Sequence, residues 1–207
     1  MTRTPRIFRN ALLLTCMLAS LAGCGKPPSL SRLAADATVL AFGDSLTFGT
    51  GAKEEDSYPA QLAPLIGRRV VRAGVPGEVT SAALERLPGA IDEHAPRILL
   101  LCIGGNDFLR RMSKAQAAAN VREMVKLATS RGVEVVLIGT PEPGLGVSPP
   151  DFYEQIAKEF KLPYDGDVIG QVLKDRNLKS DTVHPNAQGY GVIAQRLAAL
   201  LKKSGAI

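Results

Sequence analysis

Short runs of consecutive apolar residues alternate along this chain with longer segments in which apolar residues recur every three or four positions. The first pattern is typical of parallel strands buried on both faces, and the second is typical of amphipathic helices. The predicted strands are Val39–Phe42, Arg69–Arg72, Arg97–Ile103 and Val133–Ile138. The predicted helices are Tyr58–Ile66, Ala82–Leu87, Ser113–Ser130, Phe152–Phe160, Asp167–Lys174 and a last helix that ends at Lys202. This alternation predicts an α/β fold, a three-layer α/β/α sandwich around a central parallel sheet of about five strands.

Polar or glycine-rich residues directly follow three of the predicted strands. Ser45 comes after the first strand, the loop Gly74–Gly77 after the second, and Asn106 after the third. Because the carboxyl ends of parallel strands share one edge of a sheet, we expect these residues to converge in space although they lie far apart in the sequence.

Ser45 lies in the segment Gly43-Asp44-Ser45-Leu46, where an apolar strand stops at a glycine and a tight turn leads into a helix. A serine on such a turn has an exposed hydroxyl, and the backbone N–H groups beside it can point at whatever it attacks. Ser45 is therefore a candidate nucleophile. The alternative interpretation is that Asp44 and Ser45 only cap the helix, as residues of these types commonly do.

A serine nucleophile needs a base within hydrogen-bond reach and a third group that orients the base. Of the two histidines, His94 is predicted at a helix end before a strand and is interpreted as a surface or capping residue. His184 follows Asp181 by three residues in a turn fixed by Pro185, so one loop can present both the imidazole and the carboxylate that would hold it. Two histidines and at most one suitably placed cysteine are too few ligands for a metal site to be expected, and no cofactor is predicted.

The length of 207 residues fits one domain with its own core. Apolar residues make up 45% and charged residues 22% of the chain, which is ordinary for a globular protein. The formal charge of +5 includes three arginines in residues 1–23, a segment without acidic residues, so the rest of the chain carries +2. This balance gives no reason to expect a nucleic acid as partner.

The first residues have the form of a bacterial signal peptide. Basic residues precede the apolar run Ala11–Ala22, which is too short to span a bilayer. The run leads into Leu21-Ala22-Gly23-Cys24, which resembles a lipobox, in which Cys24 would be lipidated and become the new N-terminus. An ordinary signal peptide with an incidental cysteine is the alternative. Gly25 after the cysteine favours, by resemblance to Gram-negative lipoproteins, an anchor in the outer membrane that faces the periplasm.

We therefore predict a lipoprotein signal peptide at 1–23, a tether at 24–36 and one domain at 37–207. Cys16 would be removed with the signal peptide and Cys24 would carry lipid. Cys102 stands in an apolar run and is interpreted as a buried core thiol. No disulfide framework is expected.

Four sequence blocks occur in the order found in the SGNH, or GDSL, hydrolases. They are Gly43-Asp44-Ser45-Leu46, a glycine-containing block that ends at Gly77, Gly104-Gly105-Asn106-Asp107 and Asp181-Thr182-Val183-His184-Pro185. The chain is most similar to the bacterial periplasmic branch of thioesterases, arylesterases and lysophospholipases, over roughly residues 37–202. The resemblance implies a flavodoxin-like α/β/α sandwich and a serine hydrolase that cleaves ester or thioester bonds.

The same resemblance implies roles for individual residues. Ser45 would be the nucleophile, His184 the general base and acid, and Asp181 the residue that orients His184. The oxyanion hole would consist of the backbone N–H groups of Ser45 and Gly77 and the side-chain amide of Asn106. Taken alone, Asn106 also fits a turn residue and Gly77 a helix N-terminus.

The second block departs from the family pattern at two positions. Arg72 stands where family members commonly have Asn, and Pro76 stands where they commonly have Ser. Gly77 remains as the expected donor, but the hydrogen bonds that hold its loop must differ from those of the family.

Three functions follow as hypotheses. The first is a lipid-anchored hydrolase of small acyl esters and thioesters, the second a carbohydrate O-acetyl esterase, and the third a non-catalytic lipoprotein that binds an acylated partner. The intact Ser45, Asn106, Asp181 and His184 argue against the third. The expected partners are a small-molecule ester or thioester and, through Cys24, a membrane.

The acyl group is predicted to lie in a shallow apolar groove. Phe48, Val75, Phe108 and Leu109 lie beside the sequence blocks and are candidates for its floor, although Phe48 fits the core equally well. The loop 140–150 is rich in proline and glycine and can form one wall.

Overall fold

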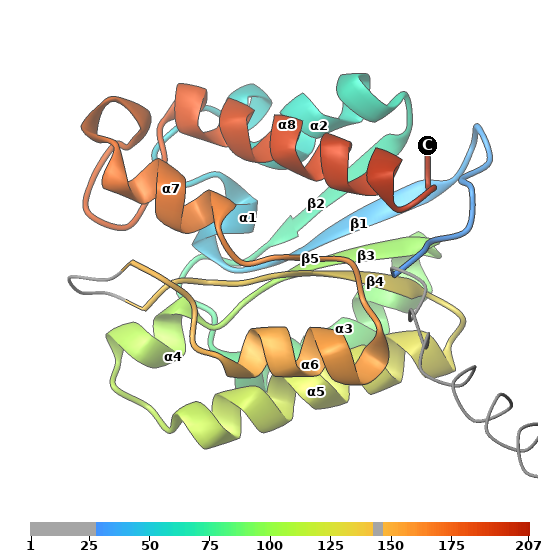
Figure 1. Cartoon of the computed structure of the whole chain (residues 1–207), viewed down its shortest axis with the longest axis horizontal. Coiled ribbons are helices and arrows are strands. Elements are labelled where there is room, and N and C mark those ends of the chain that lie inside the picture. Colours follow the sequence, from blue (N-terminus) through green and yellow to red (C-terminus); the bar gives the residue numbers. More distant parts are fainter. Residues whose placement is uncertain (1–27, 143–146) are drawn as a thin grey trace, which may run out of the picture.

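The computed structural model describes residues 28–142 and 147–207. Its centre is a five-stranded parallel sheet, which confirms the predicted α/β fold (Figure 1). The strands are β1 (Thr38–Gly43), β2 (Arg69–Gly74), β3 (Ile98–Cys102), β4 (Glu134–Ile138) and β5 (Tyr164–Asp165), in the order β2-β1-β3-β4-β5. Since the order reverses at β1, the loops after β1 and β3 diverge to opposite faces and leave room for a site between them.

Helices cover both faces of the sheet. The described helices are α1 (Ser45–Phe48), α2 (Tyr58–Ile66), α3 (Thr80–His94), α4 (Gly105–Leu109), α5 (Lys114–Ser130), α6 (Phe152–Phe160), α7 (Val168–Lys174) and α8 (Ala187–Lys203), with short 3-10 turns at η1 (Glu54–Asp56) and η2 (Arg176–Leu178). In Figure 1, α1, α2, α7 and α8 lie above the sheet and α3, α4, α5 and α6 lie below it.

Two apolar clusters, one on each face, form the core. Along β1 the side chains of Val39 and Ala41 belong to the cluster under α2 and α8, while Leu40 and Phe42 belong to the cluster over α3 and α5. This alternation is the pleat of a strand that is buried on both sides, and it explains the continuous apolar run in the sequence. Cys102 is buried in the first cluster, as predicted.

Some elements depart from the sequence prediction. Helix α3 extends to His94 although Pro88 and Gly89 weaken a helix, because Ala90 and Ile91 beyond them are buried in the core. Strand β5 has only two residues, too few to produce a periodic pattern, and its place at the sheet edge depends on pairing with β4.

The segment that we predicted as a tether is described from Pro28 onwards, and its second half packs on the domain. The N–H of Leu30 donates to the carbonyl of Ser204 at 2.7 Å, and that of Leu33 donates to Ala206 at 2.8 Å. Leu33 is also buried in the core. The chain therefore joins the fold several residues before position 37, at the end of the molecule opposite to α1 and α4 (Figure 1). Cys24 and the predicted signal peptide lie outside the described residues.

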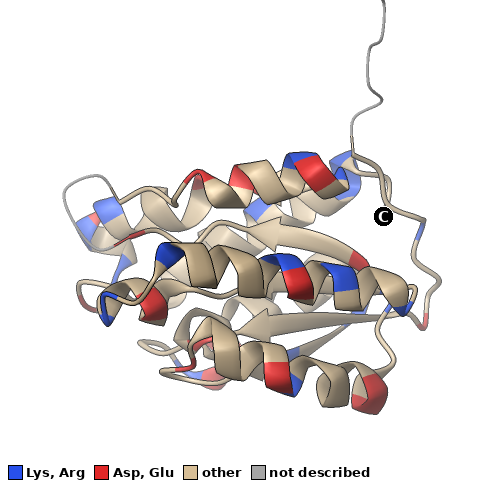
Figure 2. Ribbon diagram, turned by 90° about the horizontal axis from the view of Figure 1, so that it is seen from below, with Lys and Arg blue, Asp and Glu red and all other residues tan. Residues whose placement is uncertain are grey.

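Charges of both signs are mixed on the lower face of the molecule (Figure 2). Ion pairs join Arg122 to Glu159, Lys126 to Glu123 and Lys158 to Glu154 across or along α5 and α6. Exposed pairs of this kind contribute less than about 1 kcal/mol each. Among the described residues, no helix has the length and hydropathy needed to cross a bilayer.

Candidate active site

Ser45 is the first residue of α1 and stands directly after β1, at the carboxyl edge of the sheet. At Gly43 the chain passes so close to the neighbouring strand that a side chain would overlap the carbonyl of Cys102. This position therefore requires glycine. The carboxylate of Asp44 accepts a hydrogen bond from the N–H of Leu46 at 3.0 Å and caps the helix. The capping role that we considered as an alternative is therefore real, but it belongs to Asp44 and leaves the hydroxyl of Ser45 available.

The hydroxyl of Ser45 lies beside His184, which follows 139 residues later. The distance between Nε2 of His184 and Oγ of Ser45 is 3.0 Å. On the other side of the ring, Nδ1 lies 2.8 Å from Oδ2 of Asp181. The second oxygen of Asp181 accepts hydrogen bonds from the N–H groups of Val183 and His184, both at 2.8 Å, so a single turn fixes the carboxylate and the ring together.

Gly77 and Asn106 face the same space from the next two loops. Gly77 has a φ of 79°, a backbone conformation that favours glycine. The Nδ2 of Asn106 donates to the carbonyl of Glu78 at 3.0 Å. Since an amide nitrogen has two hydrogens, this bond fixes the orientation of the side chain and leaves one N–H for another acceptor.

The loop that carries Gly77 is held by contacts that sequence reasoning missed. Arg86 binds both carboxylate oxygens of the buried Glu78 at 2.7 Å, and it also donates to the carbonyls of Ala73 and Gly43 at 3.2 and 3.4 Å. Arg110 donates to the carbonyl of Gly77 at 2.8 Å. Side chains that pair along a helix lie three or four residues apart. Glu78 precedes α3 and Arg86 lies within it, eight residues later, so the sequence did not indicate this pair.

Arg72, the first departure from the family pattern, takes a structural part elsewhere. Its guanidinium donates to the carbonyl of Phe48 at 2.6 Å, pairs with Glu54 at 3.0 Å and stacks over the Phe48 ring. It therefore fastens the end of α1 to β2. Pro76, the second departure, is exposed and lies at the rim of the pocket described below.

Asp107 of the third block belongs to a hydrogen-bond network that connects three helices below the sheet, α3, α4 and α5. Its carboxylate accepts hydrogen bonds from the N–H and the hydroxyl of Thr80 at 2.9 and 2.6 Å, and Asn120 donates to the same hydroxyl at 2.9 Å. All three residues are buried. The network fixes the start of α3 against α4 and thereby the distance between Gly77 and Asn106.

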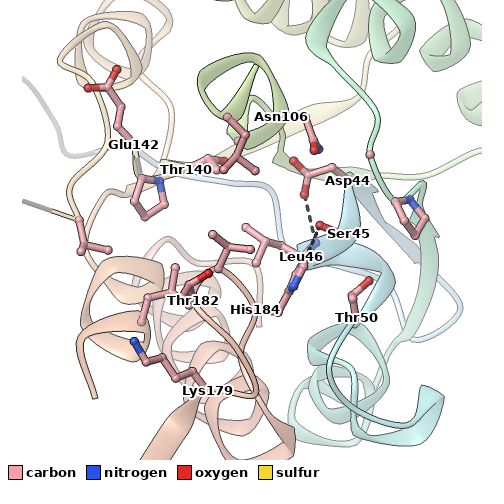
Figure 3. Close-up of a pocket in the computed structure, with 18 residues that line it drawn as sticks. Asp44, Ser45, Leu46, Thr50, Asn106, Thr140, Glu142, Lys179, Thr182 and His184 are labelled. Carbon is pink, nitrogen blue, oxygen red and sulfur yellow. Dashed lines mark hydrogen bonds between the residues drawn. The ribbon is translucent and has the colours of Figure 1, made fainter. Parts of the chain in front are cut away.

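These residues surround a cavity of about 580 Å³ (Figure 3). The lining residues are Asp44, Ser45, Leu46, Thr50, Pro76, Gly77, Gly105, Asn106, Leu109, Thr140, Pro141, Glu142, Val147, Leu173, Lys179, Thr182, Val183 and His184. The structure thus brings Ser45, Gly77 and Asn106 together at one edge of the sheet, as the convergence argument predicted, and His184 joins them there.

The predicted groove floor is wrong in part. Leu109 lines the cavity, and so does Val147 of the loop 140–150. Phe108 is buried in the core instead. Phe48 and Val75 are exposed and do not line the cavity, Phe48 because Arg72 holds it against β2. Further apolar walls come from Leu46 and Val183, which lie within two of the sequence blocks, and from Leu173, which lies outside all of them.

The two carboxylates of the site differ in protonation. Complete burial raises the pKa of Asp44 to about 7, against the lowering effects of the Leu46 N–H and of His184. Its Oδ2 is buried without a hydrogen-bond partner among the described residues. Partial burial also acts to raise the pKa of Asp181, but the hydrogen bonds from His184 and Val183 outweigh it and hold the pKa below its usual value. Asp181 is therefore ionised at neutral pH.

Neither His94 nor Cys102, the other residues that could bind a metal ion, belongs to this site. His94 ends α3, with its Nε2 3.7 Å from Glu93, and Cys102 lies in the core. In the described part of the chain, no group of three or more His, Cys, Asp or Glu side chains is arranged to hold a metal ion.

Comparisons with known proteins place this fold and site in a family. Residues 41–192 match the model of the GDSL-like Lipase/Acylhydrolase family. The chain is similar to Thioesterase 1/protease 1/lysophospholipase L1 of Escherichia coli K12, with 30% identity over 83% of this chain and 86% of that protein. It is also similar to an arylesterase of Vibrio mimicus, with 27% identity over 80% of this chain and 88% of that protein.

Solved structures agree with these relatives. The crystal structure of TesA superposes with a TM-score of 0.72 and 26% identity, over 81% of this chain and 99% of that one. The chain belongs to the GDSL-like lipase/acylhydrolase family. It is an ester hydrolase of the SGNH type.

Proposed function

We propose that Ser45 is the nucleophile of this hydrolase and that the reaction passes through an acyl-enzyme. The observation that carries the proposal is the continuous chain of contacts from Asp181 through His184 to Ser45, at 2.8 and 3.0 Å. Serine is a poor nucleophile at neutral pH unless a base removes its proton during the attack, and the imidazole of His184 is within reach to do so.

In the first half of the reaction, Oγ of Ser45 attacks the carbonyl carbon while its proton passes to Nε2 of His184. The same proton then passes to the leaving oxygen or sulfur as the acyl–heteroatom bond breaks. In the second half, water gives a proton to His184, attacks the acyl-enzyme and releases the carboxylic acid and Ser45. Asp181 stabilises the imidazolium at each stage and keeps the ring turned toward Ser45.

The negative charge of the tetrahedral intermediate would be stabilised by the N–H groups of Ser45 and Gly77 and by the remaining N–H of Asn106. The carbonyl of Glu78 already holds the amide of Asn106, and Arg110 already holds the carbonyl of Gly77. The donors therefore need little reorganisation when the charge develops. Such preorganised donors supply much of the rate enhancement in acyl transfer.

We propose that the substrates are monoacyl esters and thioesters with short to medium chains. The names of the relatives, a thioesterase/lysophospholipase and an arylesterase, support these bond types. The apolar walls at Leu46, Leu173 and Val183 support an acyl chain, and the limited cavity volume of about 580 Å³ supports an upper limit to its length.

A series of p-nitrophenyl esters tests this proposal. Each buried methylene should improve binding by about 0.8 kcal/mol until the cavity is filled, so kcat/KM should rise with chain length and then level off. A steady rise through long-chain acyl groups would contradict the limited cavity. Activity confined to acetyl esters of sugars would assign the enzyme to carbohydrate O-deacetylation instead.

We propose further that Cys24 carries lipid and holds the enzyme at the periplasmic side of the outer membrane, on the basis of the Leu21–Cys24 segment. Since the chain joins the fold at Leu30, opposite to the edge that carries Ser45, the pocket would then open away from the anchoring membrane. Cys24→Ser should abolish palmitate labelling and membrane retention. An unlabelled wild-type protein whose mature N-terminus lies elsewhere would contradict the proposal.

A further inference from the structure

The cavity wall carries few charges, and most of them are compensated. The carboxylate of Glu142 is paired with the ammonium of Lys114 at the start of α5. Complete burial raises the pKa of Asp44, so that near neutral pH much of it is uncharged. His184 is held by the ionised Asp181. Lys179 is the remaining charged residue of the wall.

No carboxylate within the described residues lies within ion-pair distance of Lys179. Residues 1–27 and 143–146 contain no Asp or Glu at all, so they cannot supply one. Lys179 as a whole is partly buried in the pocket wall. A charge-assisted hydrogen bond from its ammonium to an anionic group of a ligand would be favourable there.

The backbone of Lys179 is fixed to the loop that carries His184. Lys179 and Pro185 form a β-bridge, and Asn186 donates to the carbonyl of Lys179 at 3.5 Å. The point from which the side chain of Lys179 starts is therefore fixed relative to His184 by the backbone.

Figure 3 shows Lys179 on the side of the cavity away from Asn106, with Thr182 between it and His184. In this view the ammonium of Lys179 is drawn away from Ser45. The cavity wall also includes the apolar Leu173 and Val183. A ligand that extends from Ser45 to Lys179 therefore meets apolar side chains as well as an ammonium group, so it can combine an apolar chain with an anionic end.

We propose that Lys179 forms an anion subsite, and that the preferred substrates carry a carboxylate or phosphate group several bonds away from the scissile carbonyl. This inference rests on the proposed function of Ser45. The anion can belong to the acyl part or to the leaving group, since the cavity adjoins Ser45 and His184 alike. Both sources share one chemistry, an anionic group that pairs with the Lys179 ammonium.

Matched esters distinguish the two sources. p-Nitrophenyl hexanoate is the neutral reference, the p-nitrophenyl half-ester of adipic acid places a carboxylate at the end of the acyl chain, and 5-hexanoyloxy-2-nitrobenzoate places it on the leaving group. We expect the wild type to hydrolyse one anionic ester with a kcat/KM at least about threefold above that of the neutral ester at low salt, chiefly through KM. The advantage should decrease as salt screens the pair.

Lys179→Met should reduce the kcat/KM for that anionic ester by about tenfold, the value of one hydrogen-bonded charge pair, and should change the kcat/KM for the neutral ester by less than about twofold. Lys174→Met is the matched control, because Lys174 is exposed at the end of α7 and does not line the cavity. The control should keep the preference of the wild type.

Three results would overturn the subsite. They are a wild type that prefers the neutral ester over both anionic ones, equal losses in Lys179→Met and Lys174→Met, and an equal loss with neutral and anionic esters in Lys179→Met. If the neutral ester is hydrolysed in a Ser45-dependent manner while one of these results is found, the anion subsite fails and the proposed function stands. If no ester is hydrolysed, both fail.

Discussion

The carbonyl of Glu78 holds the side-chain amide of Asn106 at 3.0 Å, and Arg86 in turn holds the Glu78 carboxylate. This connection joins the loop after β2 to the loop after β3, and two of its three residues, Glu78 and Arg86, lie outside every family block. It keeps one N–H of Asn106 engaged, and it leaves the other for the oxyanion that we propose Asn106 stabilises. The proposed oxyanion donors are therefore held in position partly by the ion pair of Arg86 and Glu78, which takes no part in the proposed reaction.

Loss of the nucleophile or of its base should have nearly the same effect. Ser45→Ala and His184→Ala should each reduce kcat by several orders of magnitude, and the double variant should be no slower than either single one, because the two groups act as a unit. Initial rates with p-nitrophenyl esters and circular dichroism of each variant provide the measurement. A folded Ser45→Ala variant with most of its activity would rule out the proposed mechanism.

Asp181→Asn should preserve the turn and greatly reduce kcat. The Asn oxygen can still accept from the N–H of Val183, but its NH₂ group would face Nδ1 of His184 and favour the wrong tautomer, which costs up to about 10⁴-fold in kcat in related triads. Asp175→Asn is the control, since Asp175 makes the same backbone contact, to the N–H of Asn177, away from the site. Equal activity of the two variants would show that Asp181 has only a structural part.

Asn106→Ala should reduce kcat by roughly 10²–10³-fold with little change in KM, because its hydrogen bond strengthens only as negative charge develops on the substrate oxygen. Steady-state kinetics with one short-chain ester separates the two constants. A variant in which KM rises and kcat is unchanged would mean that Asn106 only positions the substrate.

Arg86→Met should act on both stability and catalysis. It would leave the carboxylate of Glu78 buried without its partner, which typically costs about 3–5 kcal/mol, and it would loosen the support of Asn106 and lower kcat. Arg122→Met, which breaks the exposed pair with Glu159, should cost less than about 1 kcal/mol and leave kcat unchanged. Denaturant unfolding and kinetics on the two variants make the comparison, and similar results for both would contradict the role of the Arg86 pair.

Asp44 should make the enzyme less stable as the pH rises. Its folded pKa of about 7 lies above the unfolded value, so the folded state binds the proton more tightly. The resulting contribution is fully present below about pH 4, decreases between pH 4 and 7, and is lost above pH 7. Asp44→Asn keeps a capping oxygen for the N–H of Leu46 and cannot ionise.

The stability of Asp44→Asn relative to wild type should therefore increase from pH 4 to pH 8, by up to about 4 kcal/mol. Urea unfolding of both proteins across this range gives the difference in the free energy of unfolding. Because the other carboxyl groups are the same in both proteins, their contributions cancel in this difference. A difference that does not vary with pH would show that Asp44 is ionised throughout and that its buried oxygen has a partner.

The sequence alone determined the sheet and the residues that can react. The uninterrupted apolar runs at β1, β3 and β4 require strands that are buried on both faces, and such strands are parallel with helices on both sides. Because Ser45, Gly77 and Asn106 follow successive strands of such a sheet, their convergence followed from topology before any distance was known. The three-residue spacing of Asp181 and His184 likewise fixed their pairing within one turn.

The contacts between separate elements and the lining of the cavity were decided only by the tertiary structure. Arg86, Arg110 and Asp107 act on residues 8 to 33 positions away, and a contact between separate elements leaves no periodic trace in the sequence. Leu173 and Lys179, which line the cavity, come from segments without a motif. Whether an apolar side chain such as Phe48 or Phe108 lines a pocket or packs elsewhere depends on which neighbour covers it, and only the folded arrangement of the neighbours settles that.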